Sequence, residues 1–556
     1  RAELVDWALG LDTQDAVVPA GTTVSRHQIG DPIHTQPVAM VYGKKADGTD
    51  DTVVFAPTND GYFHAIDASV NPDGSDTATS GTELWSYIPK EMLPHLKDLY
   101  NDNPVGTKHY GLDGAVTALK YDINGDGTIS GNDRVILYFS TGRNADTSAY
   151  YALDVTDKVN PKLLWKVDGA KLAGLGQAWS TPKIARVNIS SATQNSQRLV
   201  LVMGGGYDAM EDNGVYYNAD TVGNHVYMVD AISGNLLWSA GASGANFNNA
   251  NMTHAIPSPV TVLDIDGDGY ADRMYVGDMA AQLWRFDITN GGTVAGLVTG
   301  GVIASLGTKK DAVHAAADVR RFYAAPDVAA EQKQKLKPFL NIAIGSGYRG
   351  HPLDLTVHDR FYAIRDYNGF RQMSQAEFNI LPVIRDAASA GVPALVDITT
   401  QVAPTLPTDA PGWQLNLNTH PDWSAGEKSM VSSRTFGDQV IFTTYSPNTS
   451  PPTDPCAGVG TGTNRAYAVD VFDGSPLVDR NNDNILTTDE RSQDLRQSGI
   501  APEAAFLFPA PPSNGNMNAP PGGSGSVTCL SGVEVLNVCT KFDQRVKTYW
   551  REGMAN

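Results

Sequence analysis

One nonapeptide of this sequence carries acidic side chains at the spacing of a calcium-binding loop. It runs from Asp264 to Asp272, and its Gly269 stands at position 6, where such loops turn sharply. Its candidate ligands are the side chains of Asp264, Asp266, Asp268 and Asp272 and the backbone carbonyl of Tyr270. This oxygen-rich set favours Ca²⁺ over Mg²⁺, since Mg²⁺ takes few protein ligands in a stricter geometry.

A second stretch, from Asp122 to Asp133, follows the twelve-position pattern of an EF-hand loop, with Gly127 at position 6. Its candidate ligands are the side chains of Asp122, Asn124, Asp126 and Asp133 and the backbone carbonyl of Thr128. An Asp replaces the usual bidentate Glu at position 12, so we expect this site to be the weaker one.

A third stretch, from Asp479 to Glu490, leaves metal binding open. It has Asn484 where a Gly is usual, although Glu490 fills position 12. Its possible ligands are Asp479, Asn481, Asp483 and Glu490.

The segments that flank these loops repeat along the chain. Each repeat contains an aromatic residue, an aliphatic residue and then an Asp at the end of a predicted strand. The six Asp residues are Asp67, Asp154, Asp230, Asp287, Asp366 and Asp470. Several copies continue into a Leu-Trp pair, namely Leu84-Trp85, Leu164-Trp165 and Leu237-Trp238. Self-similarity of this kind is typical of a β-propeller, and the alternative is a series of separate sandwich domains.

Aligned repeats show that the fold does not need a metal in the loop between the first and second predicted strands of a repeat. The stretch 188–197 is equivalent to the two loops and contains no carboxylate, and 43–51 combines its acidic residues with Lys44 and Lys45. The metal ligands are therefore an addition to the repeat.

We predict one propeller domain over residues 1–556, with a lead-in at 1–29 and the propeller from 30 onward. Blades need only about 40–50 residues, so we expect insertions near 290–340, 370–430 and 447–530, with short surface helices at 326–336 and 373–381. Strands at 533–536 and 546–550 are expected to join N-terminal strands and close a seventh blade. Because Arg1 is the first residue, we expect a fragment of a longer protein.

Composition excludes some functions. The 556 residues include 41 basic and 61 acidic side chains, a net charge of −20, which argues against nucleic-acid binding. No apolar run has the length of a membrane span.

Of three cysteines, Cys529 and Cys539 are close enough in sequence for a local disulfide, with free thiols as the alternative, and Cys456 is left over. Histidines such as His95 and His109 show no metal-site spacing, so we interpret them as turn or core residues.

Six segments together resemble the C-terminal propeller domain of the PilY/PilC family of type IV pilus tip-associated biogenesis factors and adhesins. They are 29–37 (IGDPIHTQP), 58–68 (TNDGYFHAIDA), 83–89 (ELWSYIP), 150–157 (YYALDVTD), 176–182 (GQAWSTP) and 259–287. The terminal 549–552 (YWRE) also fits. The resemblance covers most of the chain.

The resemblance implies an all-β, modified seven-bladed propeller of four-stranded antiparallel blades, with a functional Ca²⁺ loop at Asp264 to Asp272. It also implies a non-enzymatic module at the bacterial cell surface or pilus tip, reached through the periplasm and associated with the outer membrane. Expected partners are the type IV pilus, minor pilins, and host-cell or abiotic surfaces. Expected roles are pilus extension, twitching motility, attachment and virulence. An N-terminal region would complete such a protein, and no Arg-Gly-Asp tripeptide occurs here.

Two other functions remain as alternatives. Trp-bearing repeats also occur in quinoprotein dehydrogenases, although the adjacent cysteine pair frequent in those enzymes is missing from this sequence. A lectin-like adhesin whose Ca²⁺ contacts a sugar is the other alternative.

Overall fold

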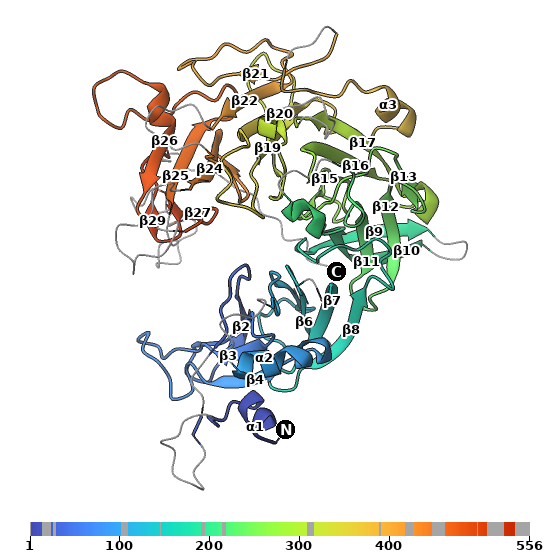
Figure 1. The fold of residues 1–556 in the computed structure, drawn as a ribbon, viewed down its shortest axis with the longest axis vertical. Coiled ribbons are helices and arrows are strands. Elements are labelled where there is room, and N and C mark those ends of the chain that lie inside the picture. Colours follow the sequence, from blue (N-terminus) through green and yellow to red (C-terminus); the bar gives the residue numbers. More distant parts are fainter. Residues whose placement is uncertain are drawn as a thin grey trace.

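Seven mainly antiparallel sheets follow one another along the chain and surround a common axis (Figure 1). The computed structural model describes residues 2–13, 24–25, 29–101, 109–144, 146–190, 195–213, 218–307, 316–387, 391–417, 426–447, 462–497, 499–508 and 527–539. The prediction of an all-β, seven-bladed propeller is confirmed.

The first three blades account for the strands up to residue 248. Blade 1 consists of β1 (Val38–Lys44), β2 (Asp50–Pro57), β3 (Phe63–Asp67) and β4 (Glu83–Tyr87). Blade 2 consists of β5 (Thr117–Tyr121), β6 (Arg134–Ser140), β7 (Ala149–Asp154) and β8 (Lys162–Asp168). Blade 3 consists of β9 (Lys183–Ser190), β10 (Asn195–Gly204), β11 (Val226–Asp230), β12 (Leu236–Gly241) and the short β13 (Phe247–Asn248).

The other four blades follow in chain order. Blade 4 consists of β14 (Thr261–Leu263), β15 (Arg273–Gly277), β16 (Gln282–Ile288) and β17 (Val298–Ser305). Blade 5 consists of β18 (Asp327–Glu331), β19 (Phe339–Gly345), β20 (Arg360–Asp366), β22 (Gly412–Asn416) and the short β21 (Val396–Asp397). Blade 6 consists of β23 (Arg434–Phe436), β24 (Gln439–Ser446), β25 (Thr463–Asp470) and β26 (Ser492–Leu495). Blade 7 consists of β27 (Ala504–Leu507), β28 (Thr528–Ser531) and β29 (Glu534–Val535).

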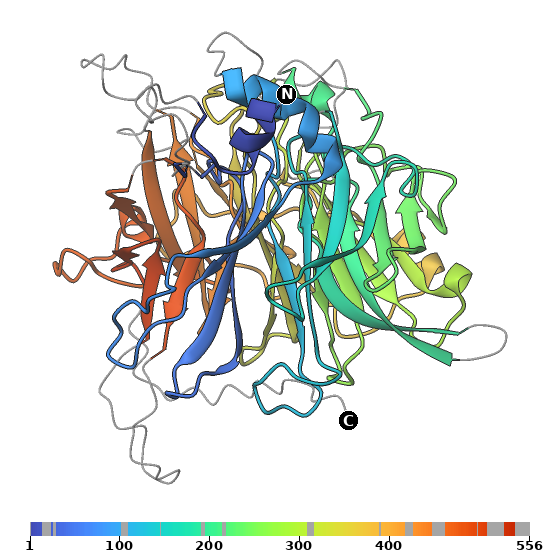
Figure 2. The same ribbon diagram turned by 90° about the horizontal axis from the view of Figure 1, so that it is seen from below.

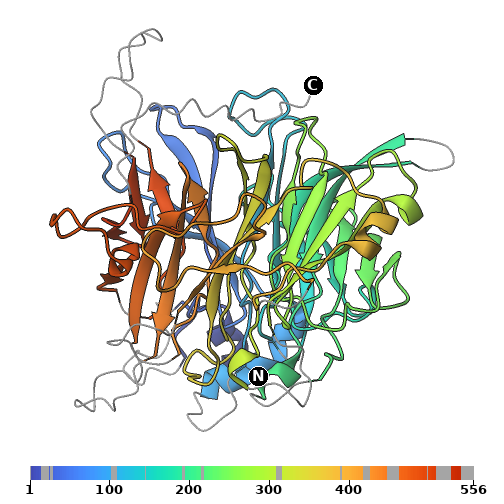
Figure 3. The same ribbon diagram turned by 90° about the horizontal axis from the view of Figure 1, so that it is seen from above.

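Short helices lie in the connections. They are α1 (Ala2–Ala8), η1 (Lys90–His95), α2 (Leu96–Asn101), η2 (Ala209–Asp212), η3 (Val294–Gly296), η4 (Ala316–Asp318), α3 (Gln375–Ile380) and η5 (Thr488–Arg491). Helices α1 and α2 sit together at one end of the ring (Figure 2). The opposite view shows α3 on the outer side of the ring (Figure 3). None of the helices in the described ranges has the length and apolar character needed to cross a bilayer.

Each of the repeated Asp residues ends, or lies next to the end of, the third strand of its blade. In five of the six, the carboxylate accepts a hydrogen bond from the backbone amide two residues later, as in Asp154 with Thr156 at 2.9 Å and Asp470 with Phe472 at 2.7 Å. This contact mimics a backbone turn and directs the chain into the fourth strand. The repeat seen in the sequence is therefore a repeated turn.

The repeated Trp residues connect neighbouring blades. The indole nitrogen of Trp165 in β8 donates to the Ala231 carbonyl in blade 3 at 3.0 Å, just past the Asp turn of that blade. Trp413 in β22 makes the same contact with the Val471 carbonyl of blade 6 at 3.1 Å. Trp85 in β4 donates to the Lys158 carbonyl of blade 2 at 2.8 Å.

Apolar cores fill the spaces between blades. Strand β6 is almost continuously apolar because its alternate residues enter two different cores. Val135, Leu137 and Phe139 pack toward blade 1, whereas Ile136 and Tyr138 pack toward blade 3. Both faces of an inner strand are thus covered. Each of the six interfaces between consecutive blades contains a buried cluster of this kind.

Three expectations need correction. Residues 326–336 contain strand β18 rather than a helix, because pairing with β19 overrides the helical preference of Ala and Glu. Blade 7 uses strands β27 to β29 and, in the described part of the chain, no N-terminal strand. Residues 546–550 lie outside the described residues. Helix α3, by contrast, confirms the helix expected at 373–381.

The third correction concerns the cysteines. Cys529 and Cys539 come together in the core between blades 6 and 7, but as free thiols. The hydrogen bond with Cys529, together with burial, raises the pKa of the Cys539 thiol, which disfavours the thiolate that disulfide formation requires. Cys456 lies outside the described residues.

The inter-blade hydrogen bond of Trp165 generates a stability prediction. Replacing Trp165 by Phe leaves the buried Ala231 carbonyl without its partner, which costs about 1–3 kcal/mol. Trp238→Phe is the matched control, because Trp238 is also buried but its indole makes no hydrogen bond to any described residue. Urea unfolding should show the larger loss for Trp165→Phe. Equal losses in the two variants would contradict a role for the hydrogen bond.

Candidate calcium-binding loops

The loop from Asp264 to Asp272 connects β14 to β15, the first and second strands of blade 4. Its backbone folds around the side chain of Asp264, which accepts hydrogen bonds from the amides of Gly267 at 2.7 Å and Gly269 at 2.8 Å. Both glycines have positive φ, 77° and 89°, a conformation that L side chains rarely adopt. The two glycines therefore allow the tight wrap that brings the acidic side chains together.

Three carboxylates of this loop converge. One oxygen each from Asp264, Asp266 and Asp268 lies within 4.8 Å of the other two, and all three residues are exposed. Oxygens bound to one Ca²⁺ at 2.3–2.6 Å can be separated by up to about 5 Å. The all-oxygen donor set and its spacing therefore fit Ca²⁺.

Asp272 lies at the base of the loop, outside this group of three. Its carboxylate accepts from the amide of Ile265 at 2.7 Å. Burial raises the pKa of the Asp272 carboxyl, and the negative charge of Asp266 raises it further. The loop thus has more negative charge than its own hydrogen bonds offset. A bound cation would relieve the repulsion between its carboxylates. Tyr270, whose carbonyl is the predicted ligand, donates its backbone amide to the Asp268 carboxylate at 2.8 Å.

The loop from Asp122 to Asp133 connects β5 to β6 in blade 2 and repeats the same hydrogen bonds. Asp122 accepts from the amides of Gly125 at 2.8 Å and Gly127 at 2.7 Å. Asn124 and Asp126 accept from the amides two residues further on, those of Asp126 at 3.2 Å and Thr128 at 2.8 Å. All the predicted ligand residues thus belong to one turn system.

Asp133 closes this second loop in a different electrostatic setting. The amides of Ile123 and Ser130 donate to its carboxylate at 2.9 and 2.8 Å, and these hydrogen bonds lower the pKa of Asp133. The ammonium group of Lys120 also contacts the Gly127 carbonyl at 3.0 Å. Positive charge is therefore already present here, so we expect Ca²⁺ to bind more weakly than in blade 4.

The third loop, from Asp479 to Glu490, has the same internal pattern although it connects β25 to β26. Asp479 accepts from the amide of Asn484 at 2.7 Å, and Asn484 takes the positive φ, 65°, that Gly provides elsewhere. Glu490 accepts from the amides of Arg480 at 2.8 Å and Thr487 at 2.9 Å. The other oxygen of Asp479 is buried and has no hydrogen-bond partner among the described residues, as expected of a ligand position.

Two of the loops lie on one face of the propeller. The blades repeat one arrangement around the axis, so their connections between first and second strands lie at the same end of the ring. The connection between β5 and β6 accordingly lies at the end of the ring opposite to α1 and α2 (Figure 2). Strand direction places the start of the third loop at this end of blade 6 as well. We call this end the acidic-loop face.

The axial channel is a second concave feature, which sequence reasoning missed. First strands of blades 2 to 6 line a cavity of about 690 Å³. A narrower part of about 90 Å³ lies beside Arg143, Trp179, Tyr323 and Arg349. The Arg143 guanidinium lies 5.6 Å from the centre of the Trp179 ring. These residues come from separate blades, so no local sequence pattern joins them. The narrow part thus brings two guanidinium groups together with aromatic side chains, whereas the lining of the wider part includes charged residues of both signs.

Comparison with known proteins identifies relatives of this chain. It is 25% identical over 501 residues to a type IV pilus biogenesis factor PilY1 homolog of Xylella fastidiosa, covering 86% of this chain and 35% of the relative. It is 26% identical over 239 residues to PilY1 of Pseudomonas aeruginosa, covering 43% of this chain and 17% of that protein. The crystal structure of the P. aeruginosa PilY1 C-terminal domain matches with a TM-score of 0.56 at 18% identity, covering 87% of this chain and 92% of that domain.

The chain is similar in sequence to proteins named PilY1 and similar in fold to the PilY1 C-terminal domain. This confirms the resemblance found in the sequence. No protein-family model matches the chain. The chain spans about a third of the length of the X. fastidiosa relative.

The carboxylate cluster of blade 4 generates a binding prediction. Asp268→Asn keeps an oxygen that can accept from the Tyr270 amide but removes one charge, so we expect Ca²⁺ affinity at this loop to fall by about tenfold or more. Asp47→Asn is the matched control: it alters a carboxylate in the β1–β2 hairpin of blade 1, where Asp47 accepts from the Thr49 amide at 2.9 Å. Calorimetric titration after chelation measures both. Unchanged binding in Asp268→Asn would show that the cluster does not hold the ion.

Proposed function

We propose that this chain is a calcium-binding, non-enzymatic module of a type IV pilus biogenesis and adhesion factor. The observation that carries the proposal is the similarity over 501 residues to a protein named as a type IV pilus biogenesis factor homolog. The propeller fold supports it, and so does the convergence of three carboxylates in blade 4.

In this proposal Ca²⁺ is held by Asp264, Asp266 and Asp268, with Asp272 closing the loop and Tyr270 offering its carbonyl. The ion supplies positive charge that offsets the repulsion among the carboxylates. The residues themselves fix the connection between β14 and β15, both of which pack into blade cores. Binding stabilises the folded form by RT ln(1 + [Ca²⁺]/Kd), about 2.7 kcal/mol when Ca²⁺ is at a hundred times Kd.

The loops from Asp122 to Asp133 and from Asp479 to Glu490 bind the same ion more weakly. Together with the blade 4 loop they give the acidic-loop face a surface that depends on Ca²⁺. An exposed surface of ordered loops suits contact with another protein. We infer that this face meets the pilus or its minor pilins at the bacterial surface, and that it supports pilus extension, twitching motility and attachment to host cells or abiotic surfaces.

The proposal is tested in cells with the complete protein. We expect a strain carrying Asp264→Ala and Asp268→Ala together to display several-fold fewer surface pili than the parent strain. The physical reason is that the loop loses two of its three clustered carboxylates and can no longer be ordered by Ca²⁺. Surface pilin is measured by shearing and immunoblotting, and twitching by the diameter of the motility zone.

Two controls make the result decisive. The Asp47→Ala strain should retain pili, since this residue lies outside the carboxylate cluster. A deletion strain should lack them. Normal piliation in the deletion strain would contradict the pilus function itself, whereas normal piliation in the double variant alone would contradict the role of calcium.

A further inference from the structure

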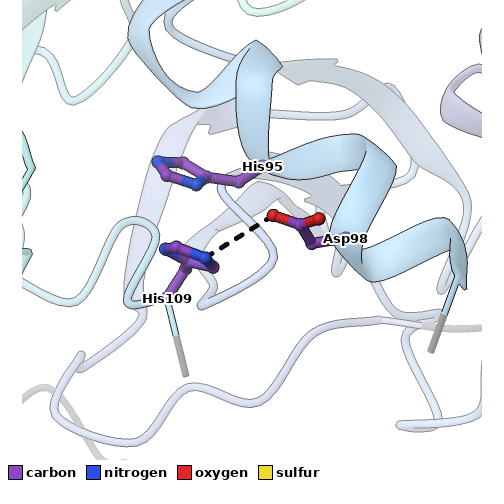
Figure 4. A group of neighbouring side chains, drawn as sticks. All are labelled: His95, Asp98 and His109. Atoms are coloured by element: carbon purple, nitrogen blue, oxygen red, sulfur yellow. Dashed lines mark ion pairs between the residues drawn. The ribbon is translucent and has the colours of Figure 1, made fainter. Parts of the chain in front are cut away.

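Two histidines and two aspartates meet at the end of the propeller opposite to the acidic-loop face. His95 ends η1 and Asp98 lies in α2, both within the connection between blades 1 and 2. His109 lies further along this connection, before β5, and Asp146 lies between β6 and β7. Figure 4 shows His95, Asp98 and His109 pointing toward a common space beside the helices.

The separations fit one metal ion. One ligand atom each from His95, Asp98 and His109 lies within 4.8 Å of the other two. Nε2 of His109 is 3.5 Å from the Asp98 carboxylate, and the two imidazole rings have centroids 4.3 Å apart. Ligands around a tetrahedral ion with bonds near 2.0–2.2 Å are about 3.3–3.6 Å apart. Small side-chain rotations would therefore bring all three to bonding distance.

Asp146 completes the arrangement from the other side of His109. Its carboxylate is 3.3 Å from Nδ1 of His109, with hydrogen-bond geometry. A proton on Nδ1 donated to Asp146 leaves the lone pair on Nε2, which faces Asp98. Metal-bound histidines ordinarily donate their second ring nitrogen to a carboxylate in this way. The same carboxylate lies 3.7 Å from Nε2 of His95.

The donor set selects the class of ion. Two imidazoles with a carboxylate suit Zn²⁺ and neighbouring transition ions, whereas Ca²⁺ and Mg²⁺ take oxygen ligands. The His95 side chain is 16% exposed and the Asp98 side chain 62%, so the ligands sit in a half-buried shell open to solvent. An ion can enter from water and keep a water at its fourth position.

We propose that His95, Asp98 and His109 bind one divalent transition ion of the Zn²⁺ class, and that Asp146 is a positioning residue for His109. The ion joins the two helices after blade 1 to the later part of the same connection, and the contact between Asp146 and His109 ties this connection to the β6–β7 connection of blade 2. This site is independent of the calcium loops, which lie at the other end of the blades, and it goes beyond the proposed pilus function.

The test is a titration of the purified chain with Zn²⁺ after chelation, with Ca²⁺ in excess to fill the oxygen sites. We expect one Zn²⁺ with micromolar or tighter affinity. His95→Gln and His109→Gln should each weaken it at least tenfold, and Asp146→Asn should weaken it by about 10–100-fold. His351→Gln should leave it unchanged, because His351 is an exposed histidine, 3.8 Å from Asp212, outside the cluster.

A spectroscopic measurement on the unaltered chain removes any dependence on how the variants fold. Co²⁺ bound at this site should give the strong visible absorption of a four-coordinate ion, and one equivalent of Zn²⁺ should abolish it. A chain that binds no Zn²⁺, or whose Co²⁺ spectrum is that of the hydrated ion, would overturn the proposal. So would equal Zn²⁺ affinity in the parent chain and the folded His95→Gln variant.

Discussion

The sheets of blades 2 to 6 carry buried apolar side chains on both faces, and a single blade cannot cover either face by itself. Strand β6 shows the constraint, since its alternate residues enter the cores toward blade 1 and toward blade 3. The blades must therefore stack, and burial between neighbours is the main source of stability. The repeated Asp turn and the repeated Trp serve this stacking: the first shapes the end of a blade, and the second bonds to that end from the adjacent blade.

Stacking also separates the chemistry of the two ends. Because the strands are antiparallel, connections of one kind gather at one end of the ring. The acidic loops of blades 2 and 4 leave at one end, and three carboxylates converge in the blade 4 loop. His95, Asp98 and His109 gather at the other end, with Arg143 and Arg349 near the axis. A rigid ring can in this way hold oxygen-rich and nitrogen-rich sites apart.

Local patterns were predictable from the sequence and distant contacts were not. The five Asp turns and the loop at Asp264 depend on residues within about a dozen positions, so their spacing indicated the structure directly. His95 and His109 are brought together by a helical connection and meet an Asp from another connection, so spacing alone led to their interpretation as turn or core residues. Strand β18 was mistaken for a helix, since its pairing with β19 is invisible in its composition.

Anomalous diffraction tests the central claim, that the converging carboxylates of blade 4 form a Ca²⁺ site built onto a repeat that does not require it. Crystals of this chain grown with Ca²⁺ should be measured at a long wavelength, where calcium scatters anomalously. The account predicts a peak between Asp264, Asp266 and Asp268, and a weaker one in the loop that begins at Asp122. An ordered blade 4 loop with no peak at saturating Ca²⁺ would contradict it.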